Sequence, residues 1–156
     1  MRKLSMLFLI LFVSVVQVNA QTTKPLTPDA ELIKQAALDY IEGWYEGNAE
    51  RMERSLHPDL EKRIVRVDDR GRHHLGQMSA MTLVQAVRSG GGKDTPKEKQ
   101  QKDVTVLDIF GNTASAKIIA SDWIDYLHLA KWQGRWVIVN VLWELKPREA
   151  TTKSTN

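Results

Sequence analysis

The sequence contains no cysteine. This excludes disulfide bonds, and it also excludes a lipid-modified cysteine at a mature amino terminus. The four histidines are scattered, and His73 and His74 are neighbours on a predicted strand, where consecutive side chains point to opposite faces. They cannot share a metal ion, and we predict neither a metal site nor a cofactor. Nucleophile elbows and paired-carboxylate signatures are also missing. The glycines at 90–92 do not form a phosphate-binding loop, because they follow a predicted helix rather than a strand, and we interpret them as a linker.

The first twenty residues have the pattern of a secretory signal peptide. Arg2 and Lys3 precede an apolar run over residues 4–16, and small residues precede a cleavage point between Ala20 and Gln21. The run is too short for a transmembrane helix, which needs roughly 20 predominantly apolar residues. We therefore predict that the protein is exported, to the periplasm or beyond, and that the mature chain is not attached to a membrane. An uncleaved anchor is the alternative.

Removing this segment leaves a nearly neutral chain. The count of basic residues falls from 22 to 20 against 19 acidic residues, so the sequence pI of 9.2 overstates the basicity of the mature protein. Nucleic acid is therefore not an expected partner. The densest basic run also contains Asp68 and Asp69, and we interpret it as a solvated hairpin rather than an anion site. Its basic members are Lys62, Arg63, Arg66, Arg70 and Arg72.

One domain is predicted over residues 29–147, after a linker at 21–28 and before a disordered tail at 148–156. Its first half is predicted to be helical, apart from two short strands within residues 63–75. The expected helix caps are Thr27, Asn48 and Ser79, each of a type that accepts a hydrogen bond from the first helical turn. Gly47 is expected to end the first helix, and Pro58 limits the second.

The second half of the domain is predicted to be a four-strand meander. The segment from Trp123 to Leu145 is apolar and is broken only by Gln133-Gly134, which is typical of a two-residue hairpin turn. Gly111-Asn112 and Ser121-Asp122 supply two further turns. The hairpin register then places Trp132 opposite Arg135, Leu129 opposite Ile138, Leu127 opposite Asn140 and Asp125 opposite Leu142.

This register gives the sheet one nearly apolar face, which we expect the helices to cover. Its members are Leu107, Ile109, Ala114, Ala116, Ile118, Asp125, Leu127, Leu129, Trp136, Ile138, Asn140 and Leu142. A change of one residue in a turn would reverse every assignment beyond it. The opposite face mixes polar residues with an apolar patch, and we predict a homodimer that buries this patch. Its members include Tyr126, Val137, Val139, Val141 and Trp143, with His128 and Lys117 at the rim.

The order of helix, short helix, small hairpin, helix and meander resembles the nuclear transport factor 2-like fold. This is a cystatin-like α+β cone, with three helices against a curved and mostly antiparallel sheet. Four segments resemble the putative lumazine-binding branch in particular, which consists largely of bacterial proteins, many of them exported: 40–48, 56–58, 123–129 and 134–140. The resemblance implies a pocket at the open end of the cone, usually in a dimer. It implies no reaction, because the superfamily holds isomerases, dehydratases and pure binding proteins.

Asp125 is the first candidate for chemistry, as the one carboxylate on the predicted inner face. It would anchor a ligand together with Asn140, act as a general base or acid, or be a structural residue held by hydrogen bonds. The further candidates for the pocket are His57 at its mouth and the aromatic residues Tyr40, Trp44, Trp123 and Trp136. The leading interpretation is an exported domain that binds a small apolar or aromatic molecule. The alternatives are an isomerase- or dehydratase-type enzyme, with Asp125 as base assisted by His57 or Tyr40, and a protein-interaction module.

Overall fold

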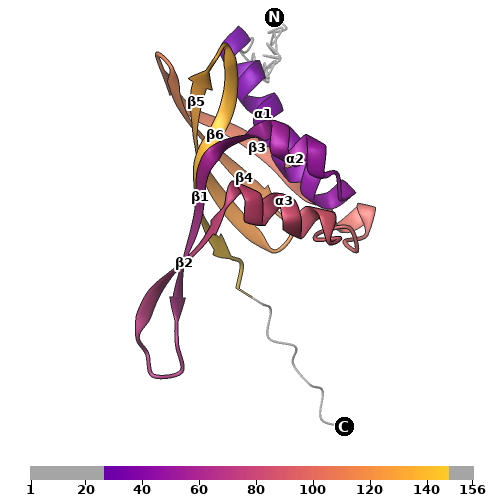
Figure 1. Cartoon of the computed structure of the whole chain (residues 1–156), viewed down its shortest axis with the longest axis vertical. Coiled ribbons are helices and arrows are strands. Elements are labelled where there is room, and N and C mark those ends of the chain that lie inside the picture. Colours follow the sequence, from indigo (N-terminus) through magenta and orange to yellow (C-terminus); the bar gives the residue numbers. More distant parts are fainter. Residues whose placement is uncertain (1–26, 148–156) are drawn as a thin grey trace, which may run out of the picture.

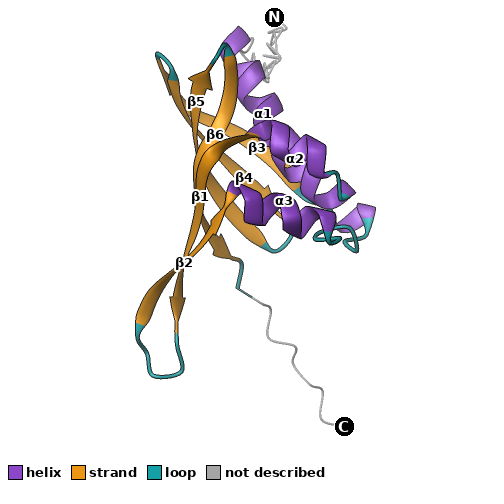
Figure 2. Ribbon diagram, viewed as in Figure 1, coloured by secondary structure: helices purple, strands orange, loops and turns teal. Residues whose placement is uncertain are grey.

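A computed structural model describes residues 27–147. The predicted signal peptide and tail lie outside the described residues. Within them, three α-helices gather on one side of a curved, open sheet (Figures 1 and 2), and none of these helices has the length and apolar character needed to cross a membrane. The elements are α1 (Pro28–Glu46), α2 (Ala49–Ser55), β1 (Leu56–Val67), β2 (His73–Ser79), α3 (Ala80–Arg88), a short 3₁₀ helix η1 (Lys97–Lys99), β3 (Lys102–Phe110), β4 (Thr113–Ala120), β5 (Trp123–Trp132) and β6 (Arg135–Leu145).

The helix boundaries follow from local side chains, as predicted. Thr27 Oγ1 accepts a hydrogen bond from the Ala30 N–H at 3.2 Å, and Asn48 and Ser79 cap α2 and α3 in the same way. Gly47 ends α1 in the left-handed conformation, with φ of 64°, which glycine adopts without steric cost. The three predicted caps and this stop are confirmed.

The sheet order is β2-β1-β6-β5-β4-β3. All neighbouring strands are antiparallel except β1 and β6, which are parallel. β1 begins directly after α2 and is longer than the predicted strand, and Pro58 lies within it. The hairpin of β1 and β2 extends beyond the helices as an arm (Figure 1). The parallel contact therefore brings the first strand of the chain beside the last one.

The predicted meander register is correct near the turns. Trp132 lies opposite Arg135 and Leu129 opposite Ile138, and the two-residue turn at Ser121-Asp122 places Ile118 opposite Asp125. The helices cover the face that carries Asp125, as expected, and the buried core lies between that face and the apolar sides of α1, α2 and α3.

A bulge in β6 changes the register beyond Ile138. The pairing shifts between His128 and Leu129, so Val139 is an extra residue on its strand. Asp125 consequently lies opposite Trp143, and Leu127 opposite Val141. The predicted pairings of these two residues with Leu142 and Asn140 are wrong, because one additional residue exchanges the faces of everything after it. Val141 and Trp143 are on the inner face, and Asn140 and Leu142 are on the outer face.

A second bulge lies in β3. Val106, rather than Leu107, is the residue opposite Ala116, and the pairing shifts before Asp108. Leu107 is 52 % exposed, so its predicted place on the inner face is also wrong.

Candidate functional site

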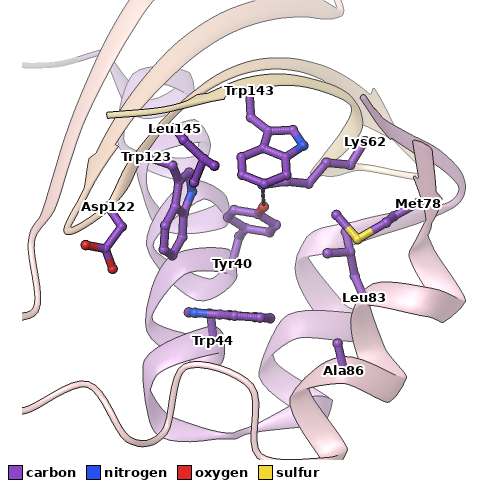
Figure 3. Close-up of a pocket in the computed structure, with 10 residues that line it drawn as sticks. All are labelled: Tyr40, Trp44, Lys62, Met78, Leu83, Ala86, Asp122, Trp123, Trp143 and Leu145. Carbon is purple, nitrogen blue, oxygen red and sulfur yellow. Dashed lines mark hydrogen bonds between the residues drawn. The ribbon is translucent and has the colours of Figure 1, made fainter. Parts of the chain in front are cut away.

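A cavity of about 310 Å³ opens at the end of the sheet where β1, β5 and β6 approach α1 and α3. We call it the Lys62 cavity, after the charged side chain at its head (Figure 3). Its walls are almost entirely apolar and aromatic, which is typical of small-molecule sites. The lining residues are Tyr40, Trp44, Lys62, Met78, Leu83, Ala86, Asp122, Trp123, Trp143 and Leu145.

A buried hydrogen-bond network forms the head of the cavity. The Lys62 ammonium donates to Asp125 Oδ1 at 2.5 Å and to the Tyr40 hydroxyl at 2.7 Å. The Trp123 indole N–H donates to the other oxygen, Asp125 Oδ2, at 2.7 Å. Lys62 is 4 % exposed and Asp125 is fully buried. Both carboxylate oxygens are therefore engaged inside the protein.

The strand arrangement explains how these residues meet. Leu60, Lys62 and Ile64 alternate along β1 and all three are buried, so Lys62 points to the inner face. β6 lies between β1 and β5, with Val141 opposite Lys62 and Trp143 opposite Asp125. The ion pair thus joins two strands that are not neighbours and crosses the inner face of β6.

Aromatic rings surround the Lys62 ammonium. The nitrogen lies 4.7 Å from the ring centre of Trp143, 5.4 Å from that of Tyr40 and 5.8 Å from that of Trp123. Such contacts stabilise a cation electrostatically. The indole nitrogen of Trp143 is itself buried and has no hydrogen-bond partner within residues 27–147. The head of the cavity therefore holds one shielded cation and one unused donor.

Burial shifts the titration of two groups at this site. It lowers the pKa of Lys62, an effect that the charge and hydrogen bond of Asp125 oppose. It raises the pKa of the Tyr40 phenol well above 10.0, and the negative charge of Asp125 acts in the same direction. Tyr40 is therefore a neutral phenol at physiological pH.

The glycines after α3 complete the floor of the cavity. Trp44 forms that floor, with its ring edge-on to Trp123 at a centroid distance of 6.1 Å. A Cβ atom added to Gly92 would lie 2.3 Å from Trp44 Cδ1, and one added to Gly91 would lie 2.8 Å from Trp44 Cη2. We interpreted these glycines from the sequence as a linker, but they let the backbone pack against the indole.

Four of the predicted site residues come together at the cavity, in two roles. Tyr40, Trp44 and Trp123 line it as expected. Asp125 does not, because it lies behind Lys62 and Trp123 and orients both. Its predicted partner Asn140 is on the opposite face, where its side chain accepts from Arg63 at 2.8 Å and contacts His128 Nδ1 at 3.3 Å. Asp125 and Asn140 therefore lie on opposite faces of the sheet and do not form the predicted pair.

Trp136 and His57 lie away from the Lys62 cavity. The Trp136 indole donates to Asp29 Oδ1 at 2.9 Å, and this bond, with one from Lys131, lowers the pKa of Asp29. His57 lines a separate cavity with residues of α2 and α3, and its ring is edge-on to Trp132 at 5.0 Å. Neither residue is placed to contact a molecule bound beside Lys62.

Lys62 and Trp143 line the head of the cavity, and the sequence analysis assigned neither of them to the candidate site. We assigned Lys62 to a solvated basic run. Its position between the apolar residues Leu60 and Ile64, however, shows the alternation that is typical of a strand with one buried face. Trp143 was assigned to the outer face because the bulge at Val139 has no local signal in the sequence.

The architecture is that of the nuclear transport factor 2-like class. A protein of this class from Shewanella baltica OS155, of unknown function, is 19 % identical and superposes with a TM-score of 0.60, covering 80 % of this chain and all of the other. One from Methylobacillus flagellatus KT gives 23 % identity and a TM-score of 0.62, covering 80 % of this chain and 97 % of that one. A ketosteroid isomerase-like protein from Erwinia carotovora atroseptica gives 12 % identity and 0.50, covering 79 % of this chain and all of the other.

Within this class, the chain belongs to the family described as "Putative lumazine-binding", whose sequence profile matches residues 28–144. The match spans nearly the whole described domain. A search of curated proteins found no match.

Proposed function

We propose that the protein is a non-enzymatic binding domain for a small, largely apolar molecule, and that the Lys62 cavity is its site. The observation that carries this proposal is the cavity itself, an apolar space of about 310 Å³ walled by three tryptophans and a tyrosine. This volume is at the lower end of the range usual for ligand pockets, about 300–1,000 Å³. The family description, which refers to the planar bicyclic compound lumazine, supports a ligand of similar shape.

The acid–base alternative loses its main support. A general base must reach the proton it removes, whereas Asp125 is fully buried behind Lys62 and both of its oxygens accept hydrogen bonds. Asp122 is the one carboxylate that lines the cavity, and its side chain points away from the space (Figure 3). His57, the second proposed catalytic residue, lines another cavity.

We also propose that the domain acts after export, on the basis of the signal-peptide pattern over residues 1–20. Mass mapping of the amino terminus should find a mature chain that begins at Gln21. Recovery of intact Met1 in a membrane fraction would contradict this proposal and would favour an uncleaved anchor.

The indole N–H groups provide a direct test of the binding site. The chain has five tryptophans; Trp44, Trp123 and Trp143 line the cavity, whereas Trp132 and Trp136 lie elsewhere. We would titrate isotope-labelled mature protein with acetylnaphthalene and, separately, with lumazine, and follow the five indole signals by NMR. Binding at the proposed site should shift the three cavity signals in a saturable way and leave the other two in place.

Trp132 and Trp136 are thus internal controls for non-specific effects. Equal shifts of all five signals would indicate general association with the surface. If neither compound shifts the three cavity signals at millimolar concentration, the proposed function is wrong.

A further inference from the structure

The chemistry of the Lys62 cavity narrows the class of its ligand. We propose that the cavity takes an uncharged, planar and largely apolar molecule that presents one hydrogen-bond acceptor to the Lys62 ammonium. This inference rests on the proposed function and adds the ligand's charge, shape and polarity to it.

The first argument is the charge balance of the site. Lys62 and Asp125 form an ion pair at 2.5 Å, and both are buried, so their charges cancel at the head of the cavity. A ligand carboxylate or phosphate would add an uncompensated negative charge to a space with apolar walls, and an amine would add a positive one. Burying a charge without a partner is costly. The site therefore favours a neutral molecule.

The aromatic walls do not alter this conclusion for cations. Rings of this kind often attract a ligand ammonium group, but here Trp143, Tyr40 and Trp123 already surround the Lys62 nitrogen within 6 Å. A ligand cation would therefore have to compete with the Lys62 ammonium for these rings.

The second argument is the balance of donors and acceptors. A lysine ammonium has three N–H donors and no acceptor, and two of those of Lys62 are committed, to Asp125 and Tyr40. The acceptors at this end are engaged, since Asp125 receives both Lys62 and Trp123. A carbonyl or ring nitrogen of a ligand would complement the one ammonium hydrogen that remains.

The third argument is shape. Trp44 forms the floor, Trp123 and Tyr40 stand beside it, and Leu83 and Met78 close the opposite side (Figure 3). Extended ring faces and flat aliphatic walls make good contact with a planar molecule.

A series of four naphthalenes with the same ring system separates these features. Acetylnaphthalene is neutral and has an acceptor, ethylnaphthalene is neutral and has none, naphthoate is an anion, and naphthylmethylammonium is a cation. Their dissociation constants for the mature wild-type protein would be measured from the three cavity indole signals. We expect acetylnaphthalene to bind about tenfold or more tighter than either ion, and about 2- to 10-fold tighter than ethylnaphthalene, the usual effect of one hydrogen bond.

The outcomes distinguish this inference from the proposed function. Naphthoate or the ammonium compound binding as tightly as the ketone would overturn the inference about charge and leave the binding function standing. Equal affinities for acetylnaphthalene and ethylnaphthalene would overturn the inference about the acceptor. If none of the four shifts the cavity signals, the inference fails; if lumazine also fails, the proposed function fails with it.

Two variants examine the role of the ion pair directly. In Lys62→Met/Asp125→Leu, which removes both charges together, the preference for acetylnaphthalene over ethylnaphthalene should disappear. In Asp125→Asn the ammonium is no longer compensated, so the affinity for naphthoate relative to the ketone should rise about tenfold. If both variants fold and each keeps the wild-type ratio of affinities for its pair of compounds, Lys62 has no role in ligand selection. If either variant fails to fold, the affinities of the four compounds for the wild-type protein decide between these outcomes.

Discussion

The Lys62 ammonium and the Asp125 carboxylate form an ion pair at 2.5 Å between β1 and β5, with both side chains buried. The pair is 63 residues apart in sequence and crosses the inner face of the strand between them. It fixes Lys62 at the head of the cavity, and through the second carboxylate oxygen it fixes Trp123 as well. Asp125 is therefore a positioning residue for two residues that line the site.

Breaking the pair from one side should destabilise the fold. Asp125→Leu leaves the Lys62 ammonium buried without a carboxylate, and we expect a loss of about 3–5 kcal/mol in the free energy of unfolding, measured in urea. The matched control is Lys62→Met/Asp125→Leu, which should recover most of this loss and retain only the cost of the Trp123 N–H without its acceptor, about 1–3 kcal/mol. If the single variant is as stable as wild type, the pair does not organise the core.

Gly92 should be sensitive to a single methyl group. Gly92→Ala combines a left-handed backbone, with φ of +77°, and a Cβ atom 2.3 Å from Trp44. Gly71→Ala is the matched control, since its φ is +74° and its Cβ atom would meet nothing within 4 Å. The control should cost about 1–2 kcal/mol from backbone strain alone. Gly92→Ala should lower the free energy of unfolding by more than the control does and should displace the NMR signal of the Trp44 indole. Similar spectra and stabilities for the two variants would mean that the loop moves to accommodate the methyl group.

Acid should weaken the contact between α1 and α2. Arg51 bridges Asp39, Glu42 and Glu46. Burial tends to raise the pKa values of Asp39 and Glu42, but the hydrogen bonds and charges of their basic partners have the larger effect. The pKa of Asp39 is therefore below its usual value of 3.8, and that of Glu42 is below its usual value of 4.5. A carboxyl group whose pKa is lower in the folded than in the unfolded protein stabilises the fold at pH values above its unfolded-state pKa. That stability is lost as the pH falls through its folded-state pKa.

This effect can be isolated by comparing Tm values of the wild type and Arg51→Ala. Their difference should be large at about pH 6 and should shrink towards about pH 3, because protonated acids no longer favour Arg51. Arg88→Ala is the control, since Arg88 is half-exposed and 3.9 Å from Glu53, and its Tm difference should be small throughout. A pH-independent difference for Arg51→Ala would assign its role to packing.

The outer sheet face should mediate a homodimer. Once the bulge in β6 is taken into account, Leu142 lies opposite Tyr126 and Val65 opposite Leu75; each is between 46 % and 56 % exposed. Apolar surface of this kind favours association. Leu142→Glu should convert a dimer to a monomer in light scattering, whereas Leu32→Glu, an equally exposed leucine on α1, should not. A monomeric wild type at tens of micromolar would contradict the prediction.

Sequence reasoning was most successful where the determinants are local. Caps such as Thr27 and the stop at Gly47 depend on a few adjacent residues, and the turn at Ser121-Asp122 set the register of its hairpin correctly. The bulge at Val139 is instead a feature of how β6 pairs with another strand, β5. Its position therefore could not be read from β6 alone, and the faces of Asn140 and Trp143 were exchanged.

The candidate site was predictable only in part for a related reason. Tyr40, Trp44 and Trp123 follow from the apolar pattern of their own segments. The alternation of Leu60, Lys62 and Ile64 indicates a buried strand face. That a charged lysine can occupy this face depends on Asp125, a carboxylate on a distant strand, and no local pattern contains that information. Gly92 is similar, since its role depends on an indole from α1.

The parallel pairing of β1 with β6 also bears on when the cavity can form during synthesis. β1 begins at Leu56, whereas β6 ends at Leu145 and is the last of the described strands to be made. Until it arrives, β1 and β5 have no common neighbour, and the positive charge of Lys62 has no stable place beside Asp125. A chain shortened before Arg135 would thus lack Trp143 and would also expose two unpaired strand edges, which are prone to aggregation. Binding capacity should accordingly appear in a single step, when β6 pairs with both β1 and β5.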